Sequence, residues 1–249
     1  MIRTLLIITG ASLVLCVAAL GGAAAVGGRD MARHGWSWTL RGDDETVRFQ
    51  RADSGPRVTR TLAWDGGDRL EIDLAADVAY VQGDAASSVE VTGPREQVEG
   101  LRLNGGRLSF DDGDDGVEVV VFGRGGRDRL RITVTAPAVR SFGLSGSGDL
   151  VIRGYDQPSL AIAIHGSGEV EATGRTESVD LDISGSGEAD LAGLETRDAD
   201  VDIFGSGEAK VGPTGAARIT ISGSGEVDLT RRPATLAQSL SGSGEVNQP

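Results

Sequence analysis

A Gly-Ser-Gly triplet followed by an acidic residue recurs six times in the second half of the chain. The triplets are 20, 19, 20, 18 and 19 residues apart and begin at Gly146, Gly166, Gly185, Gly205, Gly223 and Gly242. Self-similarity at such a spacing is the signature of a repeat architecture in which each unit stacks on its neighbours. Read alone, a glycine-serine run indicates a flexible linker. Its regular recurrence predicts a corner of the backbone instead.

Aliphatic residues keep a fixed phase around each triplet. Around the third triplet, for example, Leu181 and Ile183 precede it, and Ala189 and Leu191 follow it. Alternation with period two is typical of strands with one buried face. Each repeat is therefore expected to contain a strand, the Gly-Ser-Gly turn, a second strand and a more variable second turn. Residues 173–178 (TGRTES) are one such second turn, which absorbs the one-residue changes in spacing.

The length of the repeat selects the arrangement of these strands. A unit of 18–20 residues covers a path of roughly 60 Å, which suits one turn of a β-solenoid. We expect an all-β fold, a right-handed parallel β-helix of about 18–20 residues per turn, preceded by an N-terminal hydrophobic helix. The composition agrees, because 39% of the 249 residues are hydrophobic and only 4% are aromatic, so that the core must be aliphatic.

The chain divides into three parts on its sequence. Residues 1–28 are predicted to be a signal peptide or a single membrane anchor, residues 29–56 a linker or stalk, and residues 57–249 the solenoid domain. Within that domain, residues 57–140 form an irregular lead-in of short alternating runs, and residues 141–249 hold the six repeats. An acidic stretch in the lead-in, residues 110–116, does not match a calcium-binding loop and is expected to be a turn between strands.

The N-terminal apolar run leaves two interpretations open. Residues 4–28 carry no charge and follow Arg3, and small residues at Ala23 and Ala25 mark a cleavage site. About 20 apolar residues also suffice for an uncleaved anchor. Both interpretations predict export of the remainder, to the periplasm or the cell surface. The one cysteine, Cys16, lies inside this run after Leu15, where a lipidated cysteine would follow a smaller residue.

Charge excludes one class of partner. The chain has 37 acidic and 24 basic residues, a net charge of −13, so nucleic acid is not an expected partner. The excess lies in the repeats, because residues 141–249 contain 17 acidic and 7 basic residues, a difference of 10.

An acidic residue follows every triplet. Together these six residues are the main candidates for a binding site. Stacked coils would place these six carboxylates in a ladder with rungs about 4.8 Å apart. Divalent cations such as Ca²⁺ could bridge neighbouring rungs, with carbonyl oxygens as further ligands. The alternative is that the acids point separately into water and keep the solenoid soluble. The ladder consists of Asp149, Glu169, Glu188, Glu208, Glu226 and Glu245.

The sequence lacks the residues needed for nucleophilic catalysis, zinc binding or phosphate binding. A Ser-His-Asp arrangement in the repeats would have to use His165, which occupies a position filled by serine or phenylalanine in the other repeats. No cluster of cysteine and histidine offers a zinc site, and no glycine-rich loop carries the lysine of a phosphate-binding loop. The sequence therefore predicts no catalytic residue and no bound cofactor.

The recurring pattern of alternating apolar residues before GSG-[DE], behind a lead-in that ends in ITVTAPAV, resembles the bacterial GIN-domain family, the "putative autotransporter adhesin head" group. The resemblance covers about residues 57–249. It implies a right-handed β-helical fold, a location in the cell envelope and no established biochemical activity. The chain departs from the other repeats at His165 and Phe204, which replace the serine before the triplet.

From these observations we expect an exported envelope β-solenoid of structural or adhesin-like type, without catalytic activity. By family analogy its partners are an envelope glycan or a protein surface. Residues 4–28 would contact a membrane if they are not cleaved, and the exposed end of the solenoid, near Pro249, would favour self-association. Two alternatives stay open: a β-helical enzyme that acts on polysaccharides, and a Ca²⁺-stabilised spacer.

Overall fold

The computed structural model describes the backbone of residues 37–41, 46–51 and 118–121, and both backbone and side chains of residues 56–64, 66–83, 87–110 and 129–249. The predicted N-terminal hydrophobic helix, and the signal peptide or anchor at residues 1–28, lie outside the described residues. No helix in the described part of the chain is long and apolar enough to span a membrane.

The chain forms two compact units. One contains a small three-stranded sheet in which β1 (Ser37–Arg41) pairs antiparallel with β2 (Thr46–Arg51), and β2 pairs parallel with β9 (Glu118–Val121). Two of these strands fall within the range that the sequence assigns to a linker. The other unit contains the repeats.

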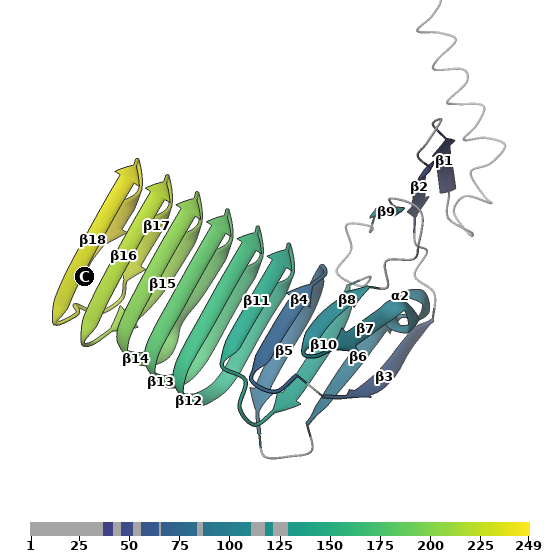
Figure 1. Cartoon of the computed structure of the whole chain (residues 1–249), viewed down its shortest axis with the longest axis horizontal. Coiled ribbons are helices and arrows are strands. Elements are labelled where there is room, and N and C mark those ends of the chain that lie inside the picture. The colour runs from purple at the N-terminus through teal and green to yellow at the C-terminus, as the bar shows by residue number, and fades with distance from the viewer. Residues whose placement is uncertain are drawn as a thin grey trace, which may run out of the picture. The chain divides into compact units, whose positions relative to one another are not determined.

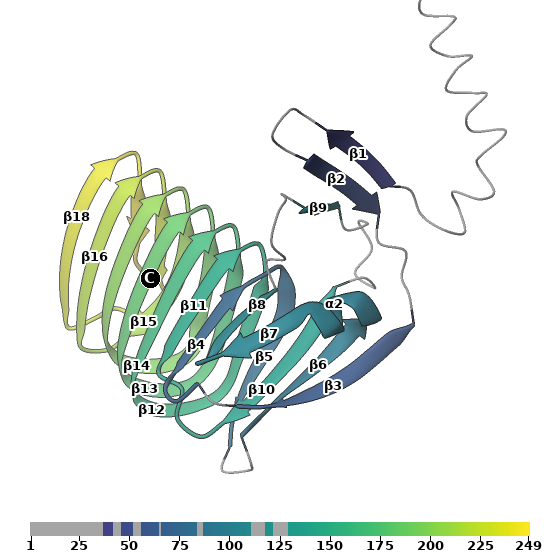
Figure 2. The same cartoon turned by 45° about the vertical axis from the view of Figure 1, so that its right-hand side comes forward.

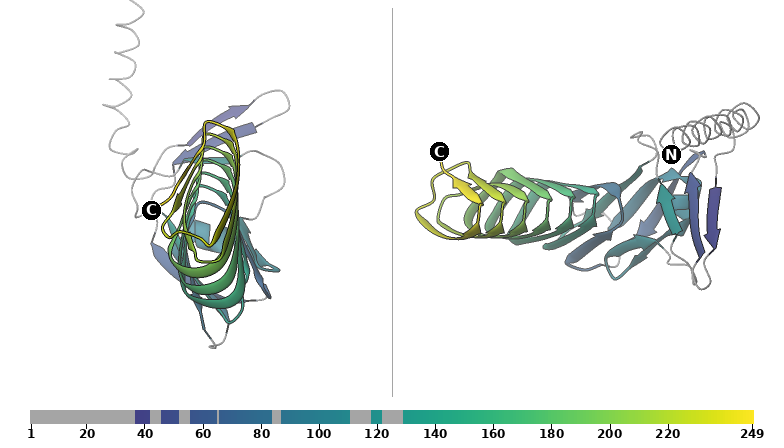
Figure 3. Two further views of the ribbon diagram at one scale, coloured as in Figure 1. Left: turned by 90° about the vertical axis from the view of Figure 1, so that its left-hand side faces the viewer. Right: turned by 90° about the horizontal axis from the view of Figure 1, so that it is seen from above.

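The compact unit that contains the repeats is a stack of coils, seen side by side in Figures 1 and 2 and end-on in Figure 3. The strands of its N-terminal part are β3 (Arg57–Ala63), β4 (Arg69–Asp73), β5 (Ala76–Gln82), β6 (Ser88–Pro94), β7 (Leu101–Asn104), β8 (Arg107–Phe110) and β10 (Leu130–Ala136), and its helix is α2 (Arg95–Gly100). The repeats form β11 (Ser141–Gly146), β12 (Asp149–Gly166), β13 (Glu169–Gly185), β14 (Glu188–Gly205), β15 (Glu208–Pro213), β16 (Ala216–Gly223), β17 (Glu226–Leu229), β18 (Thr235–Gly242) and β19 (Glu245–Asn247).

Parallel pairing between successive coils confirms the predicted parallel β-solenoid. Strands that run into the Gly-Ser-Gly corners pair in the order β8, β4, β11, second halves of β12, β13 and β14, β16, β18; we call this the pre-corner sheet. Strands that leave the corners pair in the order β10, β5, first halves of β12, β13 and β14, β15, β17, β19; we call this the post-corner sheet. At the N-terminal end, antiparallel strands extend both sheets: β7 lies beside β8, β6 lies beside β10, and β3 lies beside β6.

The second turn breaks the chain into two strands, as expected, between β15 and β16 and between β17 and β18, but not in the three repeats before them. Strands β12, β13 and β14 run unbroken through it over 17 or 18 residues. The register shifts there instead, between Ile152 and Tyr155 and between Glu171 and Gly174, for example. A bulge of this kind bends a strand and adds or removes one residue without ending the ladder. The prediction that this turn absorbs the changes in spacing is confirmed.

The core lies between the two sheets and is aliphatic, as predicted. Buried side chains stack on their equivalents from coil to coil; one such column runs Ile164, Ile183, Ile203 and Ile221. An aromatic cluster fills the junction with the lead-in, where Phe142 packs edge-on against Tyr80 and Tyr155 with ring centroids 5.0 and 6.3 Å away. The Tyr80 hydroxyl donates to the Ala136 carbonyl (2.9 Å) and accepts from the Val139 N–H (3.3 Å).

The first coil of the solenoid lacks the repeat motif, and sequence reasoning did not find it. Strand β4 pairs with β11, with Arg69 opposite Ser141, and β5 pairs with β12, with Asp77 opposite Asp149. Residues 69–82 therefore form a coil in the same register as the repeats, with Leu74 near the position of the triplet. The lead-in predicted as irregular thus supplies the base on which the repeats stack.

Candidate functional site

The Gly-Ser-Gly corners are fixed by backbone geometry. The first glycine of every triplet has a φ between 96° and 135°, a conformation that residues with a Cβ rarely adopt. In the later copies a Cβ on this glycine would also lie well inside van der Waals contact of the equivalent glycine carbonyl in the preceding coil, as at Gly205 against Gly185. Glycine is therefore required at the corner for both conformation and space.

Hydrogen bonds join each corner to the one before it. The backbone N–H of the serine donates to the carbonyl of the preceding first glycine, and the N–H of the following acid donates to that of the preceding third glycine. At the fourth triplet these bonds are Ser206 to Gly185 (2.8 Å) and Glu208 to Gly187 (3.0 Å). The backbone itself makes these bonds between successive corners. The corners are thus an ordered ladder and not a linker.

The structure brings the six predicted acids together in one column of the post-corner sheet. Register partners run in sequence from Asp149 to Glu169, Glu188, Glu208, Glu226 and Glu245. Asp77 of the first coil adds a rung below Asp149, which the sequence did not reveal because that coil has no triplet.

The chain supplies its own counter-charges to this acid ladder. Arg129 Nη1 lies 3.1 Å from Asp77 Oδ1 and 2.6 Å from Asp149 Oδ2. Farther along, Lys210 Nζ lies 3.4 Å from Glu188 Oε1 and 2.8 Å from Glu208 Oε1. Hydrogen bonding to these carboxylates raises the pKa of both cations.

The amide of Asn247 acts in the same way near the last rung. Its Nδ2 donates to Glu226 Oε1 (2.7 Å) and to Asp228 Oδ1 (2.9 Å). Repulsion between stacked carboxylates is therefore offset at three places by groups of the chain itself. Within the described residues, no group of three or more histidine, cysteine or acidic side chains is placed to hold a metal ion.

A second acidic feature lies on the pre-corner sheet, where sequence reasoning did not look. Outward-facing positions of β13 and β14 carry four aspartates in two register pairs, Asp180 opposite Asp200 and Asp182 opposite Asp202; we call these four residues the aspartate grid. The signal was an Asp-x-Asp pattern at one phase of two successive repeats. Its meaning depends on the pairing of the two strands, which brings the four carboxylates onto one small area.

Burial and mutual repulsion disfavour the charged form of two aspartates in the grid. The pKa of Asp180 and of Asp200 is raised above its usual value, mainly by burial and also by the neighbouring aspartates. Asp200 Oδ1 is buried and has no hydrogen-bond partner. The nearby cation is Arg218, whose Nε lies 3.9 Å from Asp200 Oδ2, at the limit of an ion pair.

A groove of about 490 Å³ adjoins the grid at the second-turn end of the pre-corner sheet. Asp198, Asp200 and Arg218 line it together with buried Ala199 and Ala217. The groove follows from side-chain size. The inward column that passes through it begins with Leu160 and Val179 and continues with these two alanines, so that less volume is filled there.

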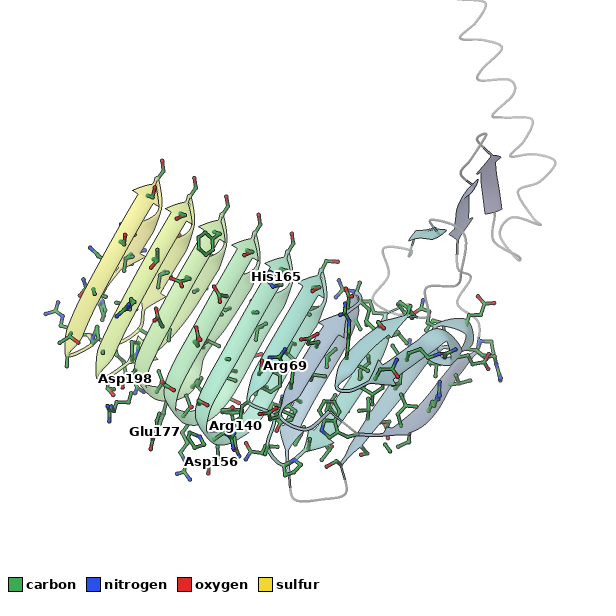
Figure 4. The ribbon with its side chains drawn as sticks, in the orientation of Figure 1. Arg69, Arg140, Asp156, His165, Glu177 and Asp198 are labelled. Atoms are coloured by element: carbon green, nitrogen blue, oxygen red, sulfur yellow. The ribbon has the colours of Figure 1, made fainter. Side chains whose placement is uncertain are left out.

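The two residues that replace serine before the triplet both point outward on the pre-corner sheet. His165 is exposed, and no hydrogen bond or ion pair of its side chain is recorded among the described residues. Figure 4 shows it near the Gly-Ser-Gly end of the strands, whereas Asp156, Glu177 and Asp198 lie at the opposite end. Phe204 lies on β14, four residues after Asp200, and is 50% exposed.

Comparison with known proteins then identifies the family. The family model described as "Putative auto-transporter adhesin, head GIN domain" matches residues 68–233. The chain belongs to this family. The matched residues include the first coil, the aspartate grid and every rung of the acid ladder except Glu245. No curated protein matches the chain.

Solved structures share the fold of this GIN-domain protein at low identity. A "putative adhesin" from Bacteroides fragilis NCTC 9343 is 19% identical, with a TM-score of 0.61 over 79% of this chain and 98% of that one. A "Putative lipid binding protein" from Parabacteroides distasonis ATCC 8503 is 22% identical, with a TM-score of 0.50 over 80% and 99%. A "putative adhesin" from the same strain is 15% identical, with a TM-score of 0.51 over 78% and 98%.

Proposed function

We propose that this GIN-domain protein is an exported, cell-envelope β-solenoid that acts as an adhesin-like interaction module without catalytic activity. The observation that carries the proposal is the in-register stack of corners, which holds two long sheets with hydrophilic outward side chains. Such a stack presents a repeated surface at fixed spacing, which suits the binding of an extended partner. Membership of the adhesin-head family supports the same role.

The absence of catalysis in this proposal rests on where the candidate groups lie. His165 stands alone on an open sheet face, whereas a nucleophilic triad needs histidine between a hydroxyl and a carboxylate. The acid ladder is also unlike a catalytic pair, because Arg129 and Lys210 engage four of its carboxylates in ion pairs. An enzyme acting on polysaccharides would leave an acid free to protonate the leaving group.

Export is part of the proposal and rests on the uncharged run at residues 4–28. Cell fractionation with protease treatment of intact cells tests it. We expect to find the repeats in the envelope fraction. A protease should cleave them in intact cells if they lie on the cell surface, or after the outer barrier is opened if they lie in the periplasm. Recovery of the chain in the cytoplasmic fraction would contradict the proposed location.

Interaction is tested with cells that lack the protein. We expect a deletion strain to lose adhesion to its partner surface, and the full-length chain to restore adhesion. A matched variant, Gly205→Ala, disturbs the corner and should fail to restore it. Hydrolysis of envelope polysaccharides by the purified chain would instead favour the enzyme alternative.

A further inference from the structure

The groove and its surroundings form one continuous surface on the pre-corner sheet. We call it the groove surface: the groove itself, the aspartate grid and Phe204. Strand β14 crosses all three, because Asp200 lines the groove, Asp202 belongs to the grid and Phe204 follows two residues later. Outward side chains at alternate residues span about 13 Å from Asp200 to Phe204.

The charge of this surface selects a cationic partner. Four carboxylates lie on two neighbouring strands. Arg218 Nε lies 3.9 Å from one of them, Asp200 Oδ2. Arg218 engages Asp200 only at the limit of contact, and Asp200 Oδ1 is buried without a hydrogen-bond donor. Lysine or arginine side chains of a partner would pair with the accessible oxygens of the four aspartates and relieve the repulsion among them.

The shape of this surface favours a polypeptide over a small ion. The groove of about 490 Å³ is lined by Ala199 and Ala217 and has room for an aliphatic side chain. Phe204 is 50% exposed and offers a ring face on which an ammonium or guanidinium group can lie. A metal ion would use neither of these features. An extended chain has the same two-residue period as β14, so its alternate side chains can follow the row of aspartates.

We propose that the groove surface binds a basic, extended segment of a protein partner, with lysine or arginine side chains over the aspartate grid and a small apolar side chain in the groove. This inference rests on the proposed function, since it names the partner of the interaction module. The affinity comes from several surface ion pairs and one apolar contact, so it falls as the salt concentration rises.

Binding of a defined peptide to the full-length chain tests the inference. The probe is a fluorescent peptide of alternating lysine and alanine, and its control alternates glutamate and alanine. We expect the lysine peptide to bind in low salt and the glutamate peptide not to bind. Saturating Ca²⁺ as competitor should weaken binding no more than NaCl of equal ionic strength. Specific displacement by Ca²⁺ would overturn the proposal in favour of a cation site.

Two charge variants distinguish the effect of the aspartate grid from the effect of the chain's net charge. Changing the four grid aspartates to asparagine should weaken binding at least about tenfold, since each surface ion pair contributes a few tenths of a kcal/mol or more. The matched control removes four charges elsewhere in the repeats and should change binding by less than about threefold. Equal losses in both variants would overturn the proposal. The control carries Glu169→Gln, Glu171→Gln, Asp190→Asn and Glu245→Gln, all on the post-corner sheet.

A second pair of variants tests the groove without changing charge. Ala216 is exposed and lines the groove, so Ala216→Phe should fill it and weaken binding about tenfold. Ala192 is exposed but lies away from the groove, and Ala192→Phe should bind as the unchanged chain does. Unchanged binding by Ala216→Phe would remove the groove from the proposal. Peptide binding in solution does not depend on where the protein is located, so this test and the fractionation experiment fail independently.

Discussion

Replacement of the first glycine of a corner offers the most direct test of how the solenoid is built. Gly205 has a φ of 126°, and a Cβ there would press on the carbonyl of Gly185. That carbonyl already accepts the N–H of Ser206 at 2.8 Å. Backbone strain of this kind costs about 1–3 kcal/mol, and forcing extra volume into a packed site costs about 1–3 kcal/mol more. We therefore expect Gly205→Ala to lower the free energy of unfolding by about 2–6 kcal/mol.

Two other glycines separate the contributions. Gly146 has a φ of 96° but open space around the position of a Cβ, so Gly146→Ala should show the backbone cost alone, about 1–3 kcal/mol. Gly143 does not have a positive φ, and its Cβ would meet Glu71 Cγ at an ordinary 3.5 Å. Gly143→Ala should therefore stay within about 0.5 kcal/mol of the unchanged chain.

Equilibrium unfolding in urea, followed by far-UV circular dichroism, measures the series. The slope of the transition must stay constant for the midpoints to be compared as free energies, because stacked repeats can unfold in parts. The expected order of stability is Gly143→Ala, then Gly146→Ala, then Gly205→Ala. Equal midpoints for Gly143→Ala and Gly205→Ala would refute the requirement for glycine at the corner.

Four further predictions concern buried and charged groups. Tyr80→Phe should lower the free energy of unfolding by about 1–3 kcal/mol, measured in urea, because it removes the acceptor of the buried Val139 N–H and one of the two donors to the Ala136 carbonyl. The raised pKa of Asp200 means that the folded chain binds this proton more tightly than the unfolded chain, so its contribution to stability increases as pH falls from neutrality through its folded pKa. Asp200→Asn should accordingly raise the urea midpoint at pH 7 and reduce the gain on acidification; a lower midpoint at pH 7 would contradict this. Lys210→Met should lower the midpoint slightly, and more in low salt than in high salt. Millimolar Ca²⁺ should raise the melting temperature no more than NaCl of equal ionic strength, and a specific rise that Glu169→Gln abolishes would support cation bridging of the acid ladder instead.

The repeats could be predicted from sequence because their signals are local. Alternating apolar residues, a glycine corner and a spacing near 19 residues each report on one coil, and stacking follows when the same pattern recurs. The register of the acid ladder followed for the same reason. Even the variable second turn was correctly assigned the role of absorbing changes in length, although β12, β13 and β14 continue through it.

What the sequence did not reveal depends on pairing between distant segments. The first coil has Leu74 near the corner and no triplet, and its partners lie 72 residues later, as Asp77 opposite Asp149 shows. Arg129, directly before β10, reaches these two acids although it lies 52 and 20 residues from them in sequence. The aspartate grid had a local signal in its Asp-x-Asp patterns. Only the pairing of β13 with β14 turns two ordinary exposed strands into a cluster.

The distribution of counter-charges between the two sheets argues against solubility as the only role of the acids. On the post-corner sheet, Arg129 and Lys210 each lie between two carboxylates of successive coils. On the pre-corner sheet, Arg107 pairs with Asp73 at 2.6 Å, but at the aspartate grid Arg218 approaches Asp200 only to 3.9 Å. Carboxylates anywhere on the surface keep a chain soluble, so solubility does not explain aspartate at positions where burial and neighbouring charge raise its pKa, as at Asp180. The basic partner that we propose would bring to the aspartate grid the positive charge that Arg129 and Lys210 bring to the acid ladder.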